Sequence, residues 1–366
     1  MRVEREPLHA LACDAVESLG APSSTATAVA DSLVAADART PGTHGVGLLP
    51  LYAEMVADDA IDPCAEPDGT GDDAITVVEG NSAFGALTGR TATAHGVAVA
   101  RDHGIAAVGI RDGTHLGRLG EWAERATAEG LAFLMFANAG GGAQNTAPFG
   151  GHKRKLSTNP LAVGIPTFEA LPFDIVVDVA TSQVSGSVVR NRHLVGRNLR
   201  DAWTTTASGD PVTDPAAFMH GEGALLPLGG RETGHKGYGL SVAVELFAAL
   251  VGGHVVGERN PDWFGNAACM MFLDPSRFGP LEEFEDRVNA VATHLRSDEV
   301  RLPGEGAHRR LKRSKREGIA VEPSVLSSLV VLARDHGVEV PEPIEAAAGA
   351  VPDEADTDHT DDVSSW

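Results

Sequence analysis

Lysine is scarce in this sequence, and acidic residues outnumber basic ones. The 366 residues include 29 Lys and Arg against 51 Asp and Glu, which gives a formal net charge of −22 at pH 7. Such a charge repels a phosphate backbone, so we expect no nucleic-acid partner. An acidic, lysine-poor surface suits a salt-rich cytoplasm, because salt screens its self-repulsion. We therefore expect a salt-adapted, halophilic protein; the alternative is an ordinary acidic protein with an acidic tail.

Cysteines and long apolar runs are also rare. Cys13, Cys64 and Cys269 lie far apart and have no Cys-x-x-Cys spacing, so we predict neither a disulfide framework nor a metal site. No apolar run reaches the roughly 18 residues that a bilayer span needs, so we expect no membrane association. The chain begins with Glu4 and Glu6 where a signal peptide would be basic and then apolar. We expect a cytoplasmic location.

Three common motifs of nucleotide-binding and hydrolytic enzymes are missing. The sequence has no GxGxxG following a strand, no GxxxxGK[ST] and no HExxH. A standard Rossmann or P-loop fold therefore has little support, and so does a zinc protease.

The pattern of apolar residues changes along the chain and divides it into four parts. Residues 1–74 show helical spacing and are predicted to form a helical N-terminal segment. Strand and helix signals alternate over residues 75–280, which is typical of an α/β domain with crossover connections. Helices return over 281–340, where we expect packing against the N-terminal segment. Residues 341–366 are acidic and poor in large apolar groups, which predicts a disordered tail.

Four stretches place a polar side chain beside glycines at the end of a regular element. They are "GTHGVGLLPLY" around His44, "RDGTHLGRLG" around His115, "STNPLAVGIP" around Asn159 and "GGRETGHKGYGL" around Lys236. A side chain in such a place is held by the scaffold but can still face a cleft. The alternative is a set of ordinary turn residues.

Taken together, these stretches resemble the malate/L-lactate/sulfolactate dehydrogenases that do not use the Rossmann fold, with their ureidoglycolate and 2,3-diketogulonate relatives. The resemblance covers about residue 7 to about residue 335. The matching segments, in order, are "DARTPGTHGVGLLPLY", "GTHLG", "STNP", "DVATS", "VTDP", "GHKGYGL" and "LPGE". It implies an α/β, non-Rossmann NAD(P)-binding fold, in which a sheet-containing cofactor lobe adjoins a helical lobe made of the N- and C-terminal segments.

The resemblance also implies an activity and a set of site residues. The activity is hydride transfer between NAD or NADP and a small 2-oxo or 2-hydroxy acid. It implies His44 as general acid/base and His115 as its close partner, with the two roles interchangeable. Imidazole suits this task because an alkoxide formed near neutral pH must be protonated. The implied substrate-binding residues are Thr43, Tyr52 and Arg118.

A further group of residues matches the family's cofactor-contacting segments. His235 and Lys236 begin a long helix, and a helix N-terminus and a lysine both favour phosphate groups; alternatively, this segment simply starts a packed helix. The resemblance also implies a homodimer with the site near the subunit contact. The implied cofactor-binding residues are Asn159, Asp178, Ala180, Thr181, Ser182, His235, Lys236, Gly304 and Glu305.

The sequence departs from the family pattern at positions that matter for the substrate. The family has an arginine four residues after the first histidine, suited to binding a carboxylate through two parallel hydrogen bonds, but here the residue is Leu48. A Gly-Lys pair of the family is replaced by Ser187 and Val188. Either another cation, such as Arg39 or Arg118, takes the arginine's place, or the substrate is not an ordinary 2-hydroxy acid but an imino acid or an uncharged carbonyl.

Three classes of function follow. The first is an active NAD(P)-dependent oxidoreductase, favoured by the presence of His44, His115 and Lys236. The second is a relative that binds the cofactor or a metabolite without turnover, favoured by the departures. The third is an interaction protein that docks through the basic run "RRLKRSKR", although a solvated helix face explains that run equally simply.

Overall fold

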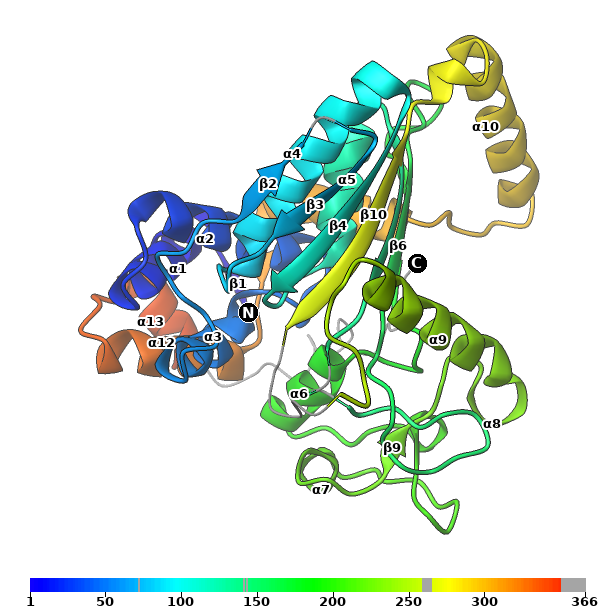
Figure 1. The fold of residues 1–366 in the computed structure, drawn as a ribbon. Helices are drawn as coiled ribbons and strands as arrows, with labels where there is room; N and C mark the ends of the chain where they lie inside the picture. The colour runs from blue at the N-terminus through cyan, green and yellow to red at the C-terminus, as the bar shows by residue number, and fades with distance from the viewer. Residues whose placement is uncertain (72, 141, 143, 259–264, 350–366) are drawn as a thin grey trace.

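A seven-stranded sheet forms the centre of the computed structural model, which describes residues 1–349 except 72, 141, 143 and 259–264. The strand order is β2-β3-β4-β10-β5-β6-β7 (Figure 1). The strands are β2 (Asp68–Thr70), β3 (Ile75–Glu79), β4 (Ile105–Gly113), β5 (Ala132–Ala137), β6 (Leu161–Ile165), β7 (Ile175–Val179) and β10 (Asn266–Leu273). The mixed α/β class predicted from the sequence is confirmed.

Most neighbouring strands of this sheet are antiparallel, but β3, β4 and β5, for which the alternating pattern predicted crossover connections, all run in the same direction. The pair β3 and β4 is parallel, and α4 (Gly85–His103) crosses between them, as a parallel pair requires. Strand β10 enters between β4 and β5 and runs antiparallel to both, so that Met270 lies opposite Val108 and Met135. The last strand of the sheet in sequence therefore lies in its middle, which no local pattern predicts.

Helices cover both faces of the sheet. They are α4 and α5 (Leu119–Ala128) on one face and α9 (His235–Leu250) on the other (Figure 1). Gly96 of α4 lies so close to the Phe272 ring that a Cβ there would come within 2.1 Å of it. On the opposite face, Phe136 of β5 stacks on Phe247 of α9 with ring centroids 4.4 Å apart. The alternation of β5 thus supplies apolar contacts to both layers.

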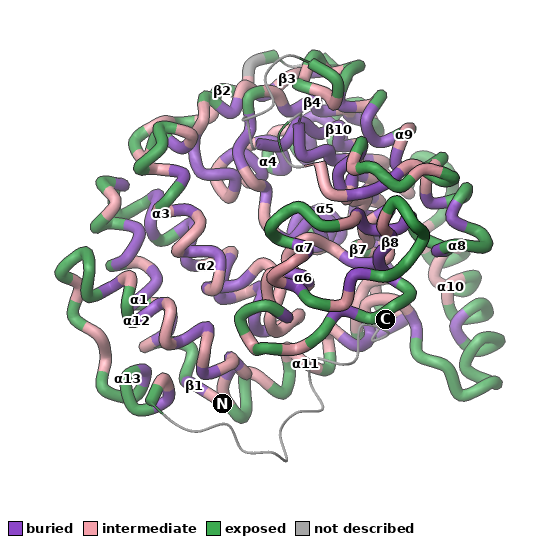
Figure 2. Tube along the Cα trace, turned by 90° about the horizontal axis from the view of Figure 1, so that it is seen from below, coloured by how far each residue is buried: buried purple, intermediate pink, exposed green. Residues whose placement is uncertain are grey.

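A helical lobe packs beside the sheet and is built from both ends of the chain. Its buried core includes Leu8, Leu33, Leu49, Leu326 and Leu329, and Figure 2 shows buried residues along the length of α2. The short strands β1 (Arg2–Val3) and β11 (Ile319–Ala320) pair at its edge. The helices are α1 (Arg5–Ser18), α2 (Ser23–Arg39), the 3-10 turn η1 (Val46–Leu48), α3 (Leu49–Ala57), α12 (Pro323–Asp335) and α13 (Glu342–Ala348).

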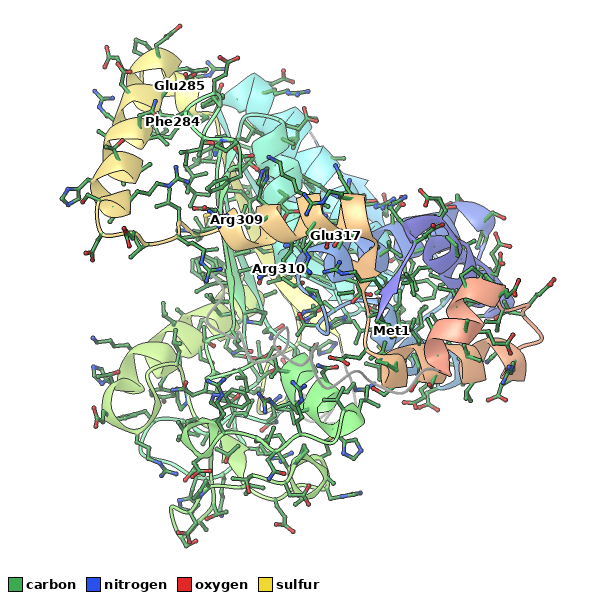
Figure 3. All side chains as sticks on the ribbon, turned by 180° about the vertical axis from the view of Figure 1, so that it is seen from behind. Met1, Phe284, Glu285, Arg309, Arg310 and Glu317 are labelled. Atoms are coloured by element: carbon green, nitrogen blue, oxygen red, sulfur yellow. The ribbon has the colours of Figure 1, made fainter. Side chains whose placement is uncertain are left out.

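Helix α11 (Glu305–Glu317) links the sheet to this lobe. Figure 3 shows it from behind, with Arg309, Arg310 and Glu317 along its length. The Nε of Arg310 donates to the carbonyl oxygen of Arg39 at 2.5 Å, and Ser314 Oγ donates to that of Ala38 at 3.2 Å. The basic run of the sequence is therefore a helix that lies along α2.

Two predictions about the C-terminal part need correction. Helix α10 (Leu281–Arg296) packs away from the N-terminal helices: its buried Ala292 joins Leu171 and Leu302 in a separate apolar cluster, and most of α10 is exposed (Figures 1 and 2). The predicted disordered tail begins too early, because α13 occupies part of it and buries Ile344. An apolar residue one turn into a proline-capped segment was enough to anchor a short helix. Residues 350–366 lie outside the described residues.

A third apolar cluster forms around Trp203, Phe218 and Leu225 within the range assigned to the cofactor lobe. It supports α6 next to the turn after α2, where Asn191 approaches Gly42. None of the helices in the described residues is both long and apolar enough to cross a membrane. The elements of this region are α6 (Gly186–Leu194), η2 (Asp201–Trp203), β8 (Thr204–Thr205), α7 (Pro215–Met219), β9 (Ala224–Leu225) and α8 (Gly230–Thr233); η3 (Pro275–Arg277) follows β10.

Candidate active site

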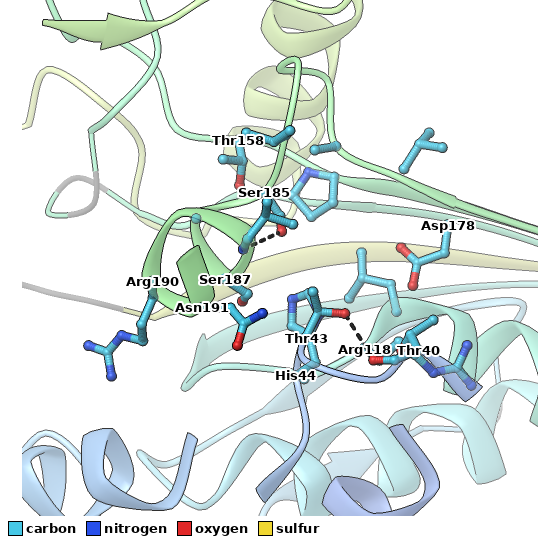
Figure 4. A pocket seen from close by; sticks show the side chains of 18 of the residues that line it. Thr40, Thr43, His44, Arg118, Thr158, Asp178, Ser185, Ser187, Arg190 and Asn191 are labelled. Carbon is cyan, nitrogen blue, oxygen red and sulfur yellow. Dashed lines mark hydrogen bonds between the residues drawn. The ribbon is translucent and has the colours of Figure 1, made fainter. Parts of the chain in front are cut away.

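A cavity of about 710 Å³ lies where the helical lobe, the sheet and α6 meet (Figure 4). Its volume falls within the range of about 300–1,000 Å³ that is typical of small-molecule sites. The turn after α2 contributes Thr43, His44 and Leu48, and the loop after β4 contributes His115 and Arg118. Strand β7, the loop that follows it and helix α6 form the opposite wall.

The turn that carries His44 is tightly constrained. His44 has a φ of 60° and Gly42 a φ of 80°, a region that side chains other than glycine rarely adopt. The buried Asp37 accepts a hydrogen bond from the Val46 backbone N–H, and Gly45 lies against its carboxyl group, where a Cβ would come within 1.9 Å of Oδ1. The glycines let the chain double back over Asp37, which directs His44 to the cavity.

The two predicted histidines lie side by side. The imidazole rings of His44 and His115 are parallel within 6°, and their centroids are 5.7 Å apart. Burial lowers the pKa of His44 below its ordinary range, and the charge of Arg118 lowers it further. Burial also lowers the pKa of His115, with His44 and Arg190 adding to the effect. Both rings are therefore neutral near pH 7.

Tyr52 supports this pair from behind rather than lining the cavity. Its hydroxyl lies 2.9 Å from Nδ1 of His115, and the side chain is buried. Burial raises the pKa of Tyr52 well above its ordinary value, so the phenol keeps its proton at neutral pH. Tyr52, which was predicted to contact the substrate, instead contacts His115 in this structure.

Arg118 faces the cavity but is held by a carboxylate. Its Nη2 lies 2.7 Å from Glu124 Oε2, and Nε of Arg39 lies 2.8 Å from the same oxygen. The Arg118 side chain is only 5% exposed. The two arginines that were candidates to replace the missing cation at position 48 therefore share one counter-ion.

Several predicted cofactor-binding residues meet at the cavity, and others lie behind it. Asn159 is buried and donates from Nδ2 to Glu245 Oε2 at 2.8 Å and to the carbonyl oxygen of Ser241 at 3.0 Å. Thr181 is also buried and donates from Oγ1 to the Thr158 carbonyl oxygen at 3.0 Å. These two residues hold the wall in place. The predicted residues that line the cavity are Asp178, Ala180, Ser182 and Gly304.

The structure does not bring the remaining three predicted cofactor residues to the cavity. His235 and Lys236 are exposed at the start of α9, where the His235 ring faces Phe149 at 5.6 Å. Glu305 is buried at the start of α11, where its carboxylate pairs with Arg296 at 3.1 Å and with Arg309. Because its carboxylate forms ion pairs with these two arginines, Glu305 stabilises the N-terminal end of α11 in this chain.

Several arginines that surround the site were not predicted from the sequence. In a chain of net charge −22, these arginines give the cavity a local positive charge that suits an anionic ligand. The segment "SVVRNRHLVGR" contains Arg190, Arg192 and Arg197. This local concentration of arginine in an acidic chain could have indicated an anion-binding site. The cavity-lining residues that were not predicted include Ser185, Arg190, Asn191, Arg192, Arg197 and Arg310.

Comparisons with known sequences identify the family of the chain. A sequence model of the malate/L-lactate dehydrogenase family matches residues 3–330. The chain is 29% identical to the L-sulfolactate dehydrogenase of Methanothermobacter thermautotrophicus, over 93% of this chain and 98% of that protein. It is 32% identical to the L-lactate dehydrogenase of Cupriavidus necator, over 93% of this chain and 99% of that protein.

Solved structures give the same answer for the fold. Malate dehydrogenase from Entamoeba histolytica superimposes with a TM-score of 0.86 and 25% identity, covering 93% of this chain and 99% of that one. A delta1-piperideine-2-carboxylate reductase from Pseudomonas syringae pvar. tomato gives a TM-score of 0.79 and 27% identity, covering 91% and 100%. The chain belongs to the malate/L-lactate dehydrogenase family, a family of oxidoreductases, as its sequence motifs predicted.

Proposed function

We propose that this protein transfers a hydride between NAD(P)H and C2 of a small 2-oxo acid, forming the 2-hydroxy acid in a reversible reaction. The observation that carries the proposal is the parallel pair of His44 and His115 at a cavity lined with arginines. The pair offers proton transfer, and the arginines offer binding of anions.

The walls of the cavity fit a dinucleotide. Arg192, Arg197 and Arg310 line it, and their positive charge suits a pyrophosphate. Asn159 Oδ1 is buried and has no hydrogen-bond partner in the described residues, and the neighbouring Thr158 and Pro160 line the cavity. The nicotinamide ring, when bound, supplies or accepts the hydride; both NAD and NADP are candidates.

His44 is assigned the proton transfer. The Nδ1 atom of His115 is engaged by Tyr52, and a protonated phenol that donates there leaves the other nitrogen of His115 with its proton. Neutral His44 accepts the hydroxyl proton when a 2-hydroxy acid is oxidised. In the opposite direction His44 must first become protonated, and a bound substrate carboxylate raises its pKa for that purpose. Thr43 and Arg118 are proposed substrate contacts.

An alternative substrate class is a cyclic imino acid. Leu48 makes the wall beside His44 apolar where the family pattern has an arginine. The fold is shared with a protein described as a piperideine-carboxylate reductase, whose name indicates reduction of a carbon–nitrogen double bond. Imino acids are therefore included in the substrate panel.

We propose a cytoplasmic homodimer as the working form. Helix α9 exposes Leu246 to 62% and Leu250 to 75%, and apolar side chains so exposed are typical of subunit contacts. The cysteines of the described residues are free thiols, as expected in a reducing compartment. Light scattering in high salt measures the molar mass of the assembly directly. A monomeric mass would contradict the proposed homodimer.

The decisive experiment follows absorbance at 340 nm in high salt with NADH or NADPH and a panel of oxaloacetate, pyruvate, sulfopyruvate and cyclic imino acids. We expect oxidation of one reduced cofactor with at least one member. His44→Ala should lower kcat by at least about 100-fold, the smallest factor typical of a lost general acid/base. Turnover with none of these compounds, while NADH still binds, would favour a protein that binds the cofactor without catalysis.

A further inference from the structure

The cavity leaves one requirement of a 2-oxo acid unmet by the residues discussed so far. Leu48, on the turn that carries His44, is apolar and cannot bind a carboxylate. Arg39 and Arg118 share the carboxylate of Glu124, and the buried Asp178 also interacts with the charge of Arg118, so these two guanidinium groups already face two carboxyl groups. A carboxylate placed beside the histidines needs another cation.

Arg190 of α6 is placed to supply it. Its half-buried side chain lines the main cavity, and it also lines a smaller cavity of about 30 Å³ shared with His44 and Leu48. In Figure 4, Arg190 and Arg118 lie on opposite sides of His44. The charge of Arg190 is also close enough to His115 to lower the pKa of that ring.

Two other new arginines of the wall are held in place by neighbouring groups. Nη1 of Arg192 donates to the Asn198 carbonyl oxygen at 2.5 Å, and its guanidinium lies over the Trp203 ring at 4.9 Å. Arg310 is bonded to the backbone of α2, as described above. By contrast, Arg190 forms neither an ion pair nor a hydrogen bond within the part of the chain that the structure describes. A half-buried arginine that lines the same cavity as two neutral histidines, and that has no counter-ion among the described residues, is suited to bind an anion.

We propose that Arg190 binds the carboxylate of the substrate and thereby selects 2-oxo acids over uncharged carbonyl compounds. This inference rests on the proposed function. Asn191 lies next to it and points toward the turn of Thr43 and His44, so its amide offers a second polar contact (Figure 4). The guanidinium matches a carboxylate with two parallel hydrogen bonds, which lysine cannot reproduce.

The test compares Arg190→Leu and Arg190→Lys with Arg287→Leu, which removes the same charge from the exposed α10, where Arg287 is 73% exposed. We expect Arg190→Leu to raise the KM for the accepted 2-oxo acid by about 10- to 150-fold, the range for a hydrogen bond to a charged group. Arg190→Lys should give an intermediate value. The dissociation constant for NADH, measured by fluorescence, should stay within threefold of wild type, and Arg287→Leu should match wild type in both.

The charge of the ligand provides a second criterion. Methyl pyruvate carries no carboxylate, so Arg190→Leu should change its KM by less than about threefold. An unchanged KM for the free acid overturns the inference, and so does a rise in the NADH dissociation constant that accounts for the whole loss. In either case turnover by the wild-type protein leaves the proposed function standing.

Binding of oxalate, an unreactive dicarboxylate, separates the two proposals further. Calorimetry with the NADH-bound protein should show oxalate binding that Arg190→Leu weakens at least tenfold and Arg287→Leu does not. If the wild-type protein turns over none of the acids but shows this pattern, the proposed function fails and the carboxylate site remains. Oxalate binding that is absent in the wild type, or equal in wild type and Arg190→Leu, overturns the carboxylate site. Unchanged circular dichroism and melting temperature exclude misfolding as the cause.

Discussion

Asp37 accepts a hydrogen bond from the backbone N–H of Val46, with 2.8 Å between Oδ2 and the nitrogen. This contact closes the turn that presents His44 to the cavity. Burial raises the pKa of Asp37 to about 7, so the carboxyl group takes up a proton more readily in the folded chain than in the unfolded one. Under the proposed function, Asp37 is a positioning residue that acts through the turn of His44.

Replacement of Asp37 should therefore reduce both stability and activity. In Asp37→Ala the buried Val46 N–H loses its acceptor, which costs about 1–3 kcal/mol of unfolding free energy. We expect kcat to fall while the dissociation constant for NADH is unchanged, because the turn no longer fixes His44. Asp31→Ala on the same helix removes a 39% exposed carboxylate and should cost at most about 1 kcal/mol. Equal effects of the two variants would contradict a special role for Asp37.

Gly45 should tolerate no side chain. The Cβ of Gly45→Ala would meet the Asp37 carboxyl group, and overpacking of this kind costs about 1–3 kcal/mol. Urea unfolding measures the loss of stability. A fall in kcat with little change in KM measures the loss of His44 alignment. The control is Gly239→Ala on α9, where a Cβ meets nothing within 4 Å. It should be neutral or slightly stabilising, because alanine favours a helix more than glycine does.

The histidine pair should make the fold sensitive to acid. The pKa values of His44 and His115 are lowered in the folded chain, so below pH 6.5 the unfolded state binds more protons than the folded state. Stability is then lost as the pH falls from 6.5, by at most about 1.4 kcal/mol per pH unit for each histidine. The raised pKa of Asp37 acts in the opposite sense.

A comparison of variants isolates this contribution. His115→Gln removes one of the two titrating rings, so its unfolding free energy should fall less than that of wild type between pH 7 and pH 5. Urea titrations at both pH values supply the difference. Identical pH dependence of the two proteins would show that His115 titrates alike in the folded and unfolded states.

Salt should stabilise the protein. The net charge of −22 makes the folded chain repel itself at low ionic strength. The Debye length falls from about 10 Å at 0.1 M to about 3 Å at 1 M, so most of this repulsion is screened at 1 M. We expect the melting temperature to rise between 0.1 M and 1 M KCl. A melting temperature that stays constant or falls would contradict salt adaptation and favour an ordinary acidic protein.

Residues with a local signature were predictable from the sequence, and residues defined only by distant contacts were not. His44 and His115 stood out because glycines flank them in family motifs, and the structure places their rings together. Arg190 follows the matched "DVATS" segment by eight residues, and nothing local ties it to His44. The central position of β10 likewise depends on pairing with strands more than 120 residues earlier in the chain. Long-range pairing of this kind leaves no periodic trace in sequence.

The pairing of β1 with β11 determines when the chain can complete its fold. The Met1 amino group donates to the carbonyl oxygen of Val321, 320 residues away, and the N-terminal helices share their core with α12 and α13. Leu8 and Leu11 of α1 share this core with α2, which follows directly, but also with α12 and α13, which are synthesised last. The core of the helical lobe is therefore complete only when both ends of the chain are present, and an incomplete core exposes apolar surface. A chain released before α12 would hold the sheet but leave uncovered the faces of α1, α3 and η1 that contact α12 in the complete fold.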